Sequence, residues 1–330
     1  MIATASVLGF TLAFFVLCWG LSLLAGGVLW ALRAQVRAAG CAVERCAAAM
    51  ALVAPPLLAL CFVLILAARS VQEGRSLHGD HCLSHAHHAH LCLLHGQAWE
   101  QRGAAWGIAA VLLLLGLRHG AGWLRAVLRV RALLRRLEPL ASTEALGRLA
   151  VWQVPAQTPL CFVTGVLRPR IVWSAGAREL LTPCERRAVL SHEAAHVAHG
   201  DLWRRALLGT AAALGAPVVA RHALAAWEHA SERLCDHRAA DAVGDATAVA
   251  SALVKLSRAG GAPIAGAASF GSGCSVEERV RALLAAPEPG ERSAGSLRRA
   301  ALLSLALALP LLAALSDPLH HALETLLGTL

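Results

Sequence analysis

Long uncharged stretches alternate with basic segments along the chain, and these stretches predict membrane-spanning helices. Residues 2–32 and 46–68 carry no charged side chain. Both exceed the roughly 20 residues that a helix needs to cross the core of a bilayer. Two shorter stretches, 103–117 and 300–316, are also uncharged and predict a third and a fourth span. The pattern therefore predicts an α-helical membrane protein with about four transmembrane helices.

The stretch 206–220 is uncharged too, but it is short and interrupted by glycine and proline. Two interpretations stay open, a segment that dips into the bilayer and a buried core helix. The N-terminal stretch has no basic beginning and no small-residue cleavage site, so we expect a retained anchor and not a cleaved signal peptide.

The arginines predict the orientation of the spans. They follow the first span, follow the third and precede the fourth: Arg33, Arg37, Arg45, Arg118, Arg125, Arg129, Arg131, Arg135, Arg136, Arg298 and Arg299. Because basic loops stay on the cytoplasmic side, we expect the loop 69–102 and both termini outside. Residues 118–136 place apolar side chains between arginines at helical spacing, which predicts an amphipathic helix on the inner leaflet. A nucleic-acid-binding stripe is the alternative for this helix.

Composition agrees with a multi-pass protein whose partner is the lipid bilayer. The 330 residues are 57% apolar and 15% charged, with a mean hydropathy of +0.57. Soluble domains are about 45–50% apolar and about 25% charged, so a disordered chain is excluded and a wholly soluble enzyme is disfavoured. The net charge of +9 comes from arginines beside the spans. We therefore expect them to face an anionic leaflet and expect no direct binding of nucleic acid.

The spans divide the chain into three parts. Residues 1–136 form the predicted membrane region, and residues 299–330 form the last span with a short tail. Residues 137–298 are left outside the membrane, and about 160 residues can bury a core of their own. Any soluble chemistry is expected in this central segment.

One helix in this segment has a clear beginning and end. Thr182 is a good N-cap, Pro183 suits the first helical position, and Glu185 completes a capping box. Gly200 is a natural stop. These signals predict a helix from about residue 183 to residue 199.

This helix carries the motif His192-Glu193-x-x-His196. Histidines at i and i+4 lie on one helix face, where both imidazoles can reach a single Zn²⁺ ion. Glu193 is rotated by about 100° from His192, so it can contact a metal-bound water and act as the catalytic base. The alternative is a surface helix with two polar histidines.

A catalytic zinc ion also needs a third protein ligand. His199 lies roughly 10 Å along the helix from His192, too far to share the ion. The chain has His199 and Leu202 where the metzincin pattern requires glycine and histidine, which excludes that class. Glu228, Glu232 and Asp236 follow at four-residue spacing. They form either an exposed acidic stripe or a second helix that provides a ligand from Glu232 and a hydrogen-bond acceptor for a ligand histidine from Asp236.

Three short runs upstream of the helix are rich in β-forming residues and predict strands: Val151–Val154, Leu160–Thr164 and Arg170–Ser174. We expect one of them to lie at the edge of a sheet and to pair with an extended substrate.

These motifs together resemble those of gluzincin-type membrane zinc metallopeptidases. Two groups share the pattern, the HtpX/CAAX-prenyl-protease group and the BlaR/MecR antirepressor group. The matching segments are 159–165, 170–176, 192–201 and 232–236. The pair Cys235-Asp236, the segment 275–284 and the order of the spans resemble the BlaR/MecR group in particular. The chain departs from that group because only residues 317–330 follow the last predicted span, where those receptors carry a penicillin-binding domain.

The resemblance implies an α+β zincin-like metallopeptidase domain facing the cytoplasm, in a bacterial inner-membrane protein. It implies one catalytic Zn²⁺ held by His192, His196 and Glu232, with Glu193 as base and Asp236 orienting a ligand histidine. It also implies a cytoplasmic or membrane protein substrate, such as a small DNA-binding repressor in a signalling pathway. The chain has no tyrosine, so the residue that stabilises the oxyanion stays open among His229, His237 and Arg238.

The outer loop 69–102 is rich in histidine. A solvated low-complexity tract is one interpretation, and a metal site formed by its histidines is the other: His81, His85, His87, His88 and His90. Cys82 and Cys92 could form a disulfide outside the cytoplasm. The loop raises a second function, a metal sensor or transporter. A catalytically inactive receptor on the protease fold is a third.

Overall fold

The computed structural model describes residues 4–73, 103–146, 149–166, 168–259, 268–269 and 275–285, with short pieces between 299 and 325. Its first helices are α1 (Thr4–Ala31), α2 (Arg33–Ala38), α3 (Cys41–Glu73) and α5 (Gly103–Leu137), and the short 3₁₀ helix η2 (Glu138–Leu140) follows. Five strands form one sheet: β1 (Ser142–Leu146), β2 (Leu149–Val154), β3 (Cys161–Thr164), β4 (Arg170–Ser174) and β5 (Ala268–Ser269). The remaining helices are α6 (Ala175–Leu180), α7 (Pro183–His199), α8 (Asp201–Leu214), α9 (Pro217–Val243), α10 (Ala246–Arg258) and α11 (Val276–Leu284).

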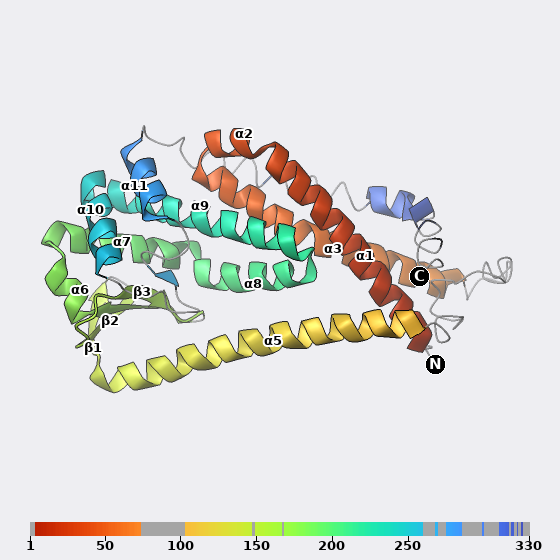
Figure 1. The fold of residues 1–330 in the computed structure, drawn as a ribbon, viewed down its shortest axis with the longest axis horizontal. Helices are drawn as coiled ribbons and strands as arrows, with labels where there is room; N and C mark the ends of the chain where they lie inside the picture. Colours follow the sequence, from red (N-terminus) through yellow and green to blue (C-terminus); the bar gives the residue numbers. More distant parts are fainter. Residues whose placement is uncertain are drawn as a thin grey trace.

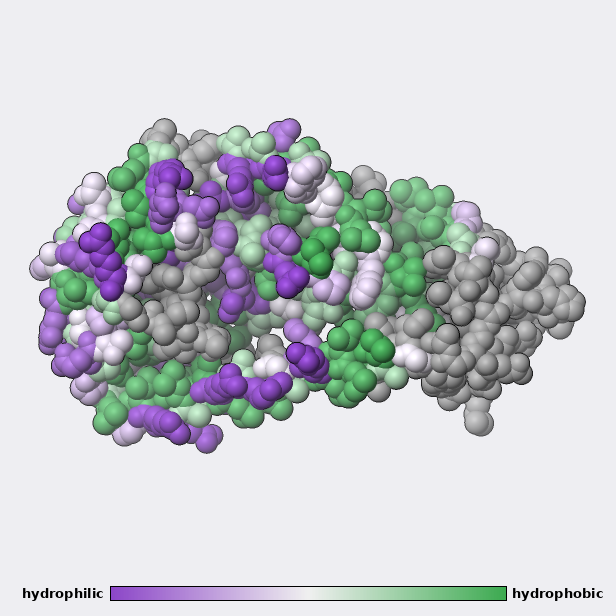
Figure 2. All heavy atoms as spheres, viewed as in Figure 1, coloured by the Kyte–Doolittle hydropathy of each residue, from purple (hydrophilic) through white to green (hydrophobic). Residues whose placement is uncertain are grey.

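Two of the described helices are long and apolar enough to cross a membrane, over Gly9–Ala31 in α1 and Cys41–Arg69 in α3. Short α2 joins them, so they run side by side in opposite directions (Figure 1). Large apolar side chains are exposed on both: Trp19, Leu23, Leu24, Val28 and Trp30 on α1, and Leu57, Leu60 and Leu64 on α3. Hydrophilic side chains gather instead at the end of the molecule that holds the sheet (Figure 2). The first two predicted spans therefore correspond to α1 and α3.

The third predicted span and the predicted inner-leaflet helix form one continuous helix. Helix α5 covers both 103–117 and 118–136 without a break, because no proline separates them. It extends along one side of the molecule towards the sheet (Figure 1). At its C-terminal end, Leu133, Leu134 and Leu137 pack against the sheet. The last turns of the amphipathic segment therefore contact protein, whereas the segment was expected to lie on lipid.

The three predicted strands are present as β2, β3 and β4, but the prediction about the edge of the sheet was wrong. The strand order is β1-β2-β4-β3-β5. Antiparallel β1 covers β2, and β4 lies between β2 and β3. Strand β5 pairs with β3 at Phe162 and Val163 only. β1 was missed because its sequence, Ser-Thr-Glu-Ala-Leu, has little apolar alternation.

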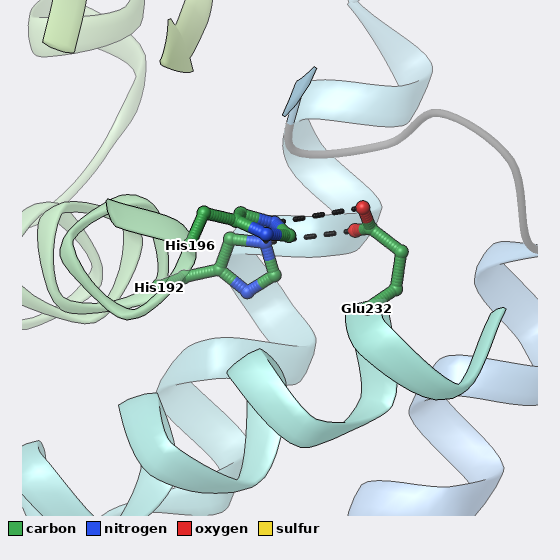
Figure 3. A group of neighbouring side chains, drawn as sticks. All are labelled: His192, His196 and Glu232. Carbon is green, nitrogen blue, oxygen red and sulfur yellow. Dashed lines mark hydrogen bonds and ion pairs between the residues drawn. The ribbon is translucent and has the colours of Figure 1, made fainter. Parts of the chain in front are cut away.

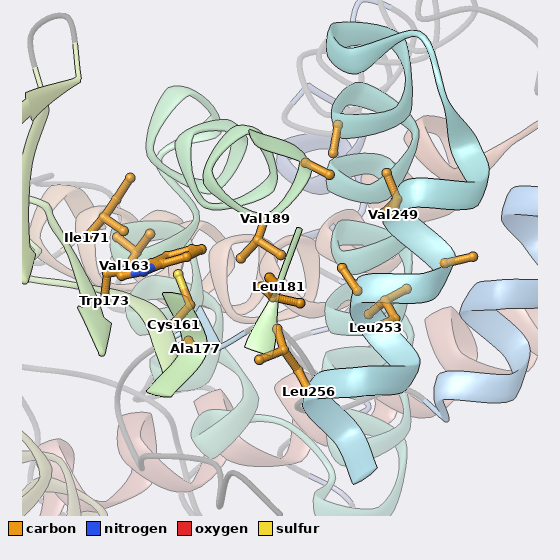
Figure 4. Packing of buried hydrophobic residues seen from close by; sticks show 14 of the residues in the cluster. Cys161, Val163, Ile171, Trp173, Ala177, Leu181, Val189, Val249, Leu253 and Leu256 are labelled. Carbon is orange, nitrogen blue, oxygen red and sulfur yellow. The ribbon is translucent and has the colours of Figure 1, made fainter. Parts of the chain in front are cut away.

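The main core lies between the sheet and the helices that follow it. Side chains from β3 and β4, among them Val163 and Ile171, face Val189 of α7, and Leu253 of α10 lies on the far side of Val189 (Figure 4). Val163, Ile171 and Val189 are fully buried. The helix with the His-Glu-x-x-His motif is thus held against the sheet on one side and by α10 on the other.

Helices α8 and α9 form a hairpin across the stretch 206–220, with the turn at Gly215 and Ala216. The hairpin packs against the candidate spans, with Leu208 and Trp227 in one buried cluster with Leu52 of α3. At the turn, the Cys18 thiol of α1 donates a hydrogen bond to the carbonyl oxygen of Leu214 at 3.4 Å. The stretch is therefore a hairpin packed against α1 and α3, and neither helix of it is a span among the described residues.

Several predictions fall outside the described residues. They include the His-rich part of the loop, with its candidate metal site and the Cys82–Cys92 pair, and most of the span 300–316.

Candidate metal centre

Helix α7 presents the two histidines of the motif towards the interior. It begins with the predicted capping box, in which Thr182 N–H donates to Glu185 Oε2 at 2.8 Å and the Thr182 side chain caps the Glu185 N–H. It ends at Gly200, whose φ of 65° lies in the left-handed region that favours glycine. Between these ends, His192 and His196 lie one turn apart, 0% and 2% exposed, with their Nε2 atoms 3.1 Å from each other. Their burial excludes the surface-helix interpretation.

Glu232 reaches the same point from α9. Its carboxylate points from α9 towards both imidazoles (Figure 3), with Oε2 3.6 Å from His192 Nε2 and Oε1 3.5 Å from His196 Nε2. Glu232 is 6% exposed and Asp236 is 1% exposed, so the acidic series on α9 is no exposed stripe at these two positions. Three side chains whose residues lie up to 40 positions apart in the sequence therefore meet at one point.

A carboxylate lies behind each histidine. His192 Nδ1 is 3.0 Å from Asp236 Oδ1, and His196 Nδ1 is 2.7 Å from Asp201 Oδ2. Such a partner fixes the ring orientation and directs the Nε2 lone pair away from the carboxylate, as metal-binding histidines require. Both Nε2 atoms therefore point at the space beside Glu232.

Arg279, from α11, neutralises the carboxylates on α9. It is fully buried, and its Nη1 lies 3.0 Å from Glu232 Oε2. Burial acts to raise the pKa values of Glu232 and Asp236, but the charge of Arg279 and the contacts with the histidines together outweigh burial and hold both pKa values below their usual range. Both carboxylates are consequently ionised at neutral pH, the state in which they can bind a cation.

The histidines and Glu193 respond to the same surroundings. Burial acts to lower the pKa of His192, but its hydrogen bonds to Asp236 and Glu232 outweigh burial and raise the pKa to about 9. Burial raises the pKa of Glu193 to about 7, against the lowering effect of His192 and His196. Glu193 is fully buried, and neither of its carboxylate oxygens has a hydrogen-bond partner among the described residues. A buried carboxylate without partners is costly, and a bound ligand beside it would remove this cost.

The residues fit a divalent metal ion. His192, His196 and Glu232 each offer one ligand atom, and these atoms lie within 4.8 Å of one another. Two imidazole nitrogens and one carboxylate oxygen form a ligand set found in catalytic zinc sites, which keep a fourth position for water. Glu193 follows His192 in the chain, and the charges of His192, His196 and Glu232 all act on its carboxylate, so it is placed to contact such a water.

Three residues of the centre, Asp201, Arg279 and Arg45, had no predicted role at the metal site. Asp201 directly follows Gly200 and begins α8. It ends the segment 192–201, one of those that resemble the family, and this resemblance could have identified it. Arg279 lies in the segment 275–284, which also belongs to the resemblance. Arg45 of α3 is buried and pairs with Asp201. The one sequence feature that could have pointed to Arg45 is its place directly before the uncharged stretch 46–68.

The three candidates for stabilising an oxyanion lie on α9 and are half-buried. Around the helix, His229 is about 60° from Glu232, whereas His237 and Arg238 are more than about 100° away. His229 is therefore the candidate nearest the face that carries Glu232, and its role stays a prediction. His199 lies outside the metal cluster, with its Nδ1 3.8 Å from the Cys235 sulfur.

Comparison with known proteins adds one match. The family described as BlaR1 peptidase M56 matches residues 81–283, which is more than half of the chain. Searches of the curated proteins and of the solved structures gave no significant match. The matched range includes α7, α9 and almost all of α11, and so all the residues of the centre except Arg45.

Proposed function

The chain belongs to the BlaR1 peptidase M56 family of membrane metallopeptidases, and from this premise we propose that it is a zinc-dependent endopeptidase. The observation that carries the proposal is the convergence of His192, His196 and Glu232 beside the buried, partnerless carboxylate of Glu193. A catalytically inactive receptor would have no need to keep this set complete.

The residues of the centre divide the chemistry among them. When bound, a zinc ion would supply Lewis-acid activation of a water molecule, whose pKa it lowers towards about 7. Glu193 would take the proton from this water as the water attacks a peptide carbonyl, and would then pass it to the leaving amine. Asp236 and Asp201 hold the rings of His192 and His196 in place throughout.

An extended substrate would bind along β3. This strand contacts α7, and β5 pairs with it at two residues only. A short partner strand can be displaced at the cost of few backbone hydrogen bonds, and an extended peptide can then add to the edge that it leaves. The substrate that we propose is a cytoplasmic or membrane protein, with a small DNA-binding repressor suggested by the family resemblance.

The membrane arrangement that we propose has four spans, with the peptidase segment in the cytoplasm. The arrangement of the helices supports this orientation, since the beginnings of α1 and α5 lie at one end of the molecule and α2 lies towards the other, where the sheet is (Figure 1). Arg33, Arg37 and Arg45 are near α2, on the sheet side, as the positive-inside rule requires of a cytoplasmic face.

A Glu193→Gln variant of the full chain, purified in detergent and loaded with zinc, tests the proposal. We expect metal content by emission spectrometry to stay near that of the native chain. Cleavage of a quenched fluorescent peptide library should fall by about 10²–10⁴-fold, the usual contribution of a general base. In cells, N-terminal labelling of proteins should lose the cleavage products that the native chain generates, and these products identify the substrate.

The matched control is Glu228→Gln, which makes the same change on α9. Glu228 pairs with Arg205 and lies outside the metal cluster, so activity and metal content should both be retained. Undiminished cleavage by metal-loaded Glu193→Gln would show that the base is assigned wrongly. Absence of bound zinc in the native chain would refute the proposal as a whole.

A further inference from the structure

A buried arginine from a candidate membrane span reaches the metal centre through one carboxylate. Arg45 lies near the start of α3 and is 4% exposed. Its Nη2 contacts Asp201 Oδ1, and the other oxygen of Asp201 lies 2.7 Å from His196 Nδ1. Asp201 is itself 4% exposed. One carboxylate therefore connects the start of α3 to a candidate metal ligand.

The position of the Arg45 guanidinium is fixed by further contacts. It lies over the indole ring of Trp227 on α9, 5.3 Å from the ring centroid, and Trp227 is 3% exposed. The preceding residue, Glu44, pairs with Arg233, which directly follows Glu232. Two successive residues of α3 thus contact the segment behind His196 and the segment that carries Glu232.

Packing alone does not explain an arginine at this position. A buried ion pair is often no more stabilising than apolar side chains of the same volume, and apolar residues of α3 such as Leu52 already pack against the α8–α9 hairpin. The arginine fixes the orientation of the Asp201 carboxylate, because its planar guanidinium holds one carboxylate oxygen in a defined place. The opposite oxygen then has a fixed orientation towards His196.

We propose that Arg45 is a positioning residue for the metal centre, which orients His196 through Asp201 and makes metal affinity depend on the position of α3. This inference rests on the proposed metallopeptidase function and extends it. Displacement of the start of α3 would move Asp201, and the ring of His196 would lose the orientation that metal binding needs. A change in the membrane segment would thereby reach the catalytic centre over two side-chain contacts.

The test is the affinity of the full chain for Co²⁺, followed by the visible absorption of the bound ion. We expect Asp201→Asn to weaken Co²⁺ binding by about 10–100-fold, which is typical for loss of the hydrogen-bond partner of a ligand histidine. Arg45→Met should weaken it by about 10-fold and change the absorption band, and Arg45→Lys should restore part of the affinity. Arg33→Met removes an exposed arginine on the same side, whose guanidinium lies over exposed Trp30, and should change nothing.

The double variant Arg45→Met/Asp201→Asn separates positioning from a general loss of structure. It removes both buried charges together, so it remains informative even if Arg45→Met alone fails to fold. If Arg45 acts through Asp201, the double variant binds Co²⁺ as Asp201→Asn does, within about twofold, because the two effects are not additive. A further tenfold loss in the double variant would overturn the inference.

The failure of this inference is distinct from failure of the proposed function. Equal Co²⁺ affinity in Arg45→Met and the native chain would refute the role of Arg45 and leave the metal centre standing. No Co²⁺ binding by the native chain would refute both.

Discussion

The guanidinium of Arg279 forms a bidentate ion pair with Asp236, its Nε 2.8 Å from Oδ2 and its Nη2 2.6 Å from Oδ1. Asp236 Oδ1 is also the atom that lies 3.0 Å from His192 Nδ1. The orientation of a candidate metal ligand therefore depends on an arginine from α11, 87 positions further along the chain. Short helix α11 completes the centre although none of its side chains is a ligand.

Arg279→Met should destabilise the protein and weaken its metal binding. The variant leaves the buried carboxylates of Asp236 and Glu232 without their compensating charge, and breaking a buried ion pair in this way costs about 3–5 kcal/mol. Denaturant unfolding of the detergent-solubilised chain measures this loss. Arg281→Met, on the same helix, removes an exposed partner of Glu277 and should cost less than about 1 kcal/mol. Similar losses in the two variants would contradict the role given to Arg279.

Glu232→Gln tests the third ligand. An amide is a much poorer zinc ligand than a carboxylate, so zinc affinity should fall by more than the 10–100-fold typical of losing a ligand's hydrogen-bond partner. Competition with a chromophoric chelator measures the affinity. Zinc at 100 times its Kd should stabilise the native chain by about 2.7 kcal/mol, and chelation should remove this stabilisation. A Glu232→Gln variant with unchanged zinc affinity would show that the third ligand is another residue.

The lowered pKa of Glu185 predicts how the free energy of unfolding changes at low pH. Burial acts to raise its pKa, but hydrogen bonds from Lys255, Ser251 and Thr182 outweigh burial and lower the pKa to about 2. The folded state therefore binds this proton less readily than the unfolded state, whose pKa is about 4.5. The stabilisation is complete above about pH 4.5 and is lost as the pH falls towards 2.

Glu185→Gln should consequently lower the free energy of unfolding by about 2 kcal/mol at pH 7. The difference from the native chain should shrink below about pH 4.5. Exposed Glu179, on the neighbouring helix α6, gives the control variant Glu179→Gln, for which we expect no change at either pH. A Glu185→Gln deficit that stayed constant down to pH 2 would rule out this source of acid sensitivity.

Local signals predicted the parts of the fold that depend on local structure. The ends of α7 followed from Thr182, Glu185 and Gly200, since caps act within one turn of the helix. Strands β2 to β4 followed from runs of β-forming residues. The order of the strands in the sheet was not predicted. The pairing of β3 with β5, for example, joins residues more than 100 positions apart, beyond the reach of local patterns.

The candidate site divides in the same way. His192 and His196 share a helix face, so their spacing alone predicted their approach. Glu232 and Asp236 needed the resemblance to a known family as well. Arg45 and Asp201 are 156 positions apart, and no periodicity within either segment could reveal that they meet. The candidate ligands and Asp236 were thus predicted, whereas Asp201, Arg279 and Arg45, which support them from other elements, were not.

The contact between Arg45 and Asp201 also bears on where the catalytic unit begins. The segment 137–298 contains His192, Glu193, His196 and Glu232, yet it lacks the arginine that holds Asp201 and the α3 surface that covers Trp227. If this segment were fused to another membrane anchor, it would contain all three candidate ligands. The indole ring of Trp227 would then be exposed, and Asp201 would lose its contact with Arg45. The smallest unit that keeps these contacts therefore includes α3 as well as residues 137–298.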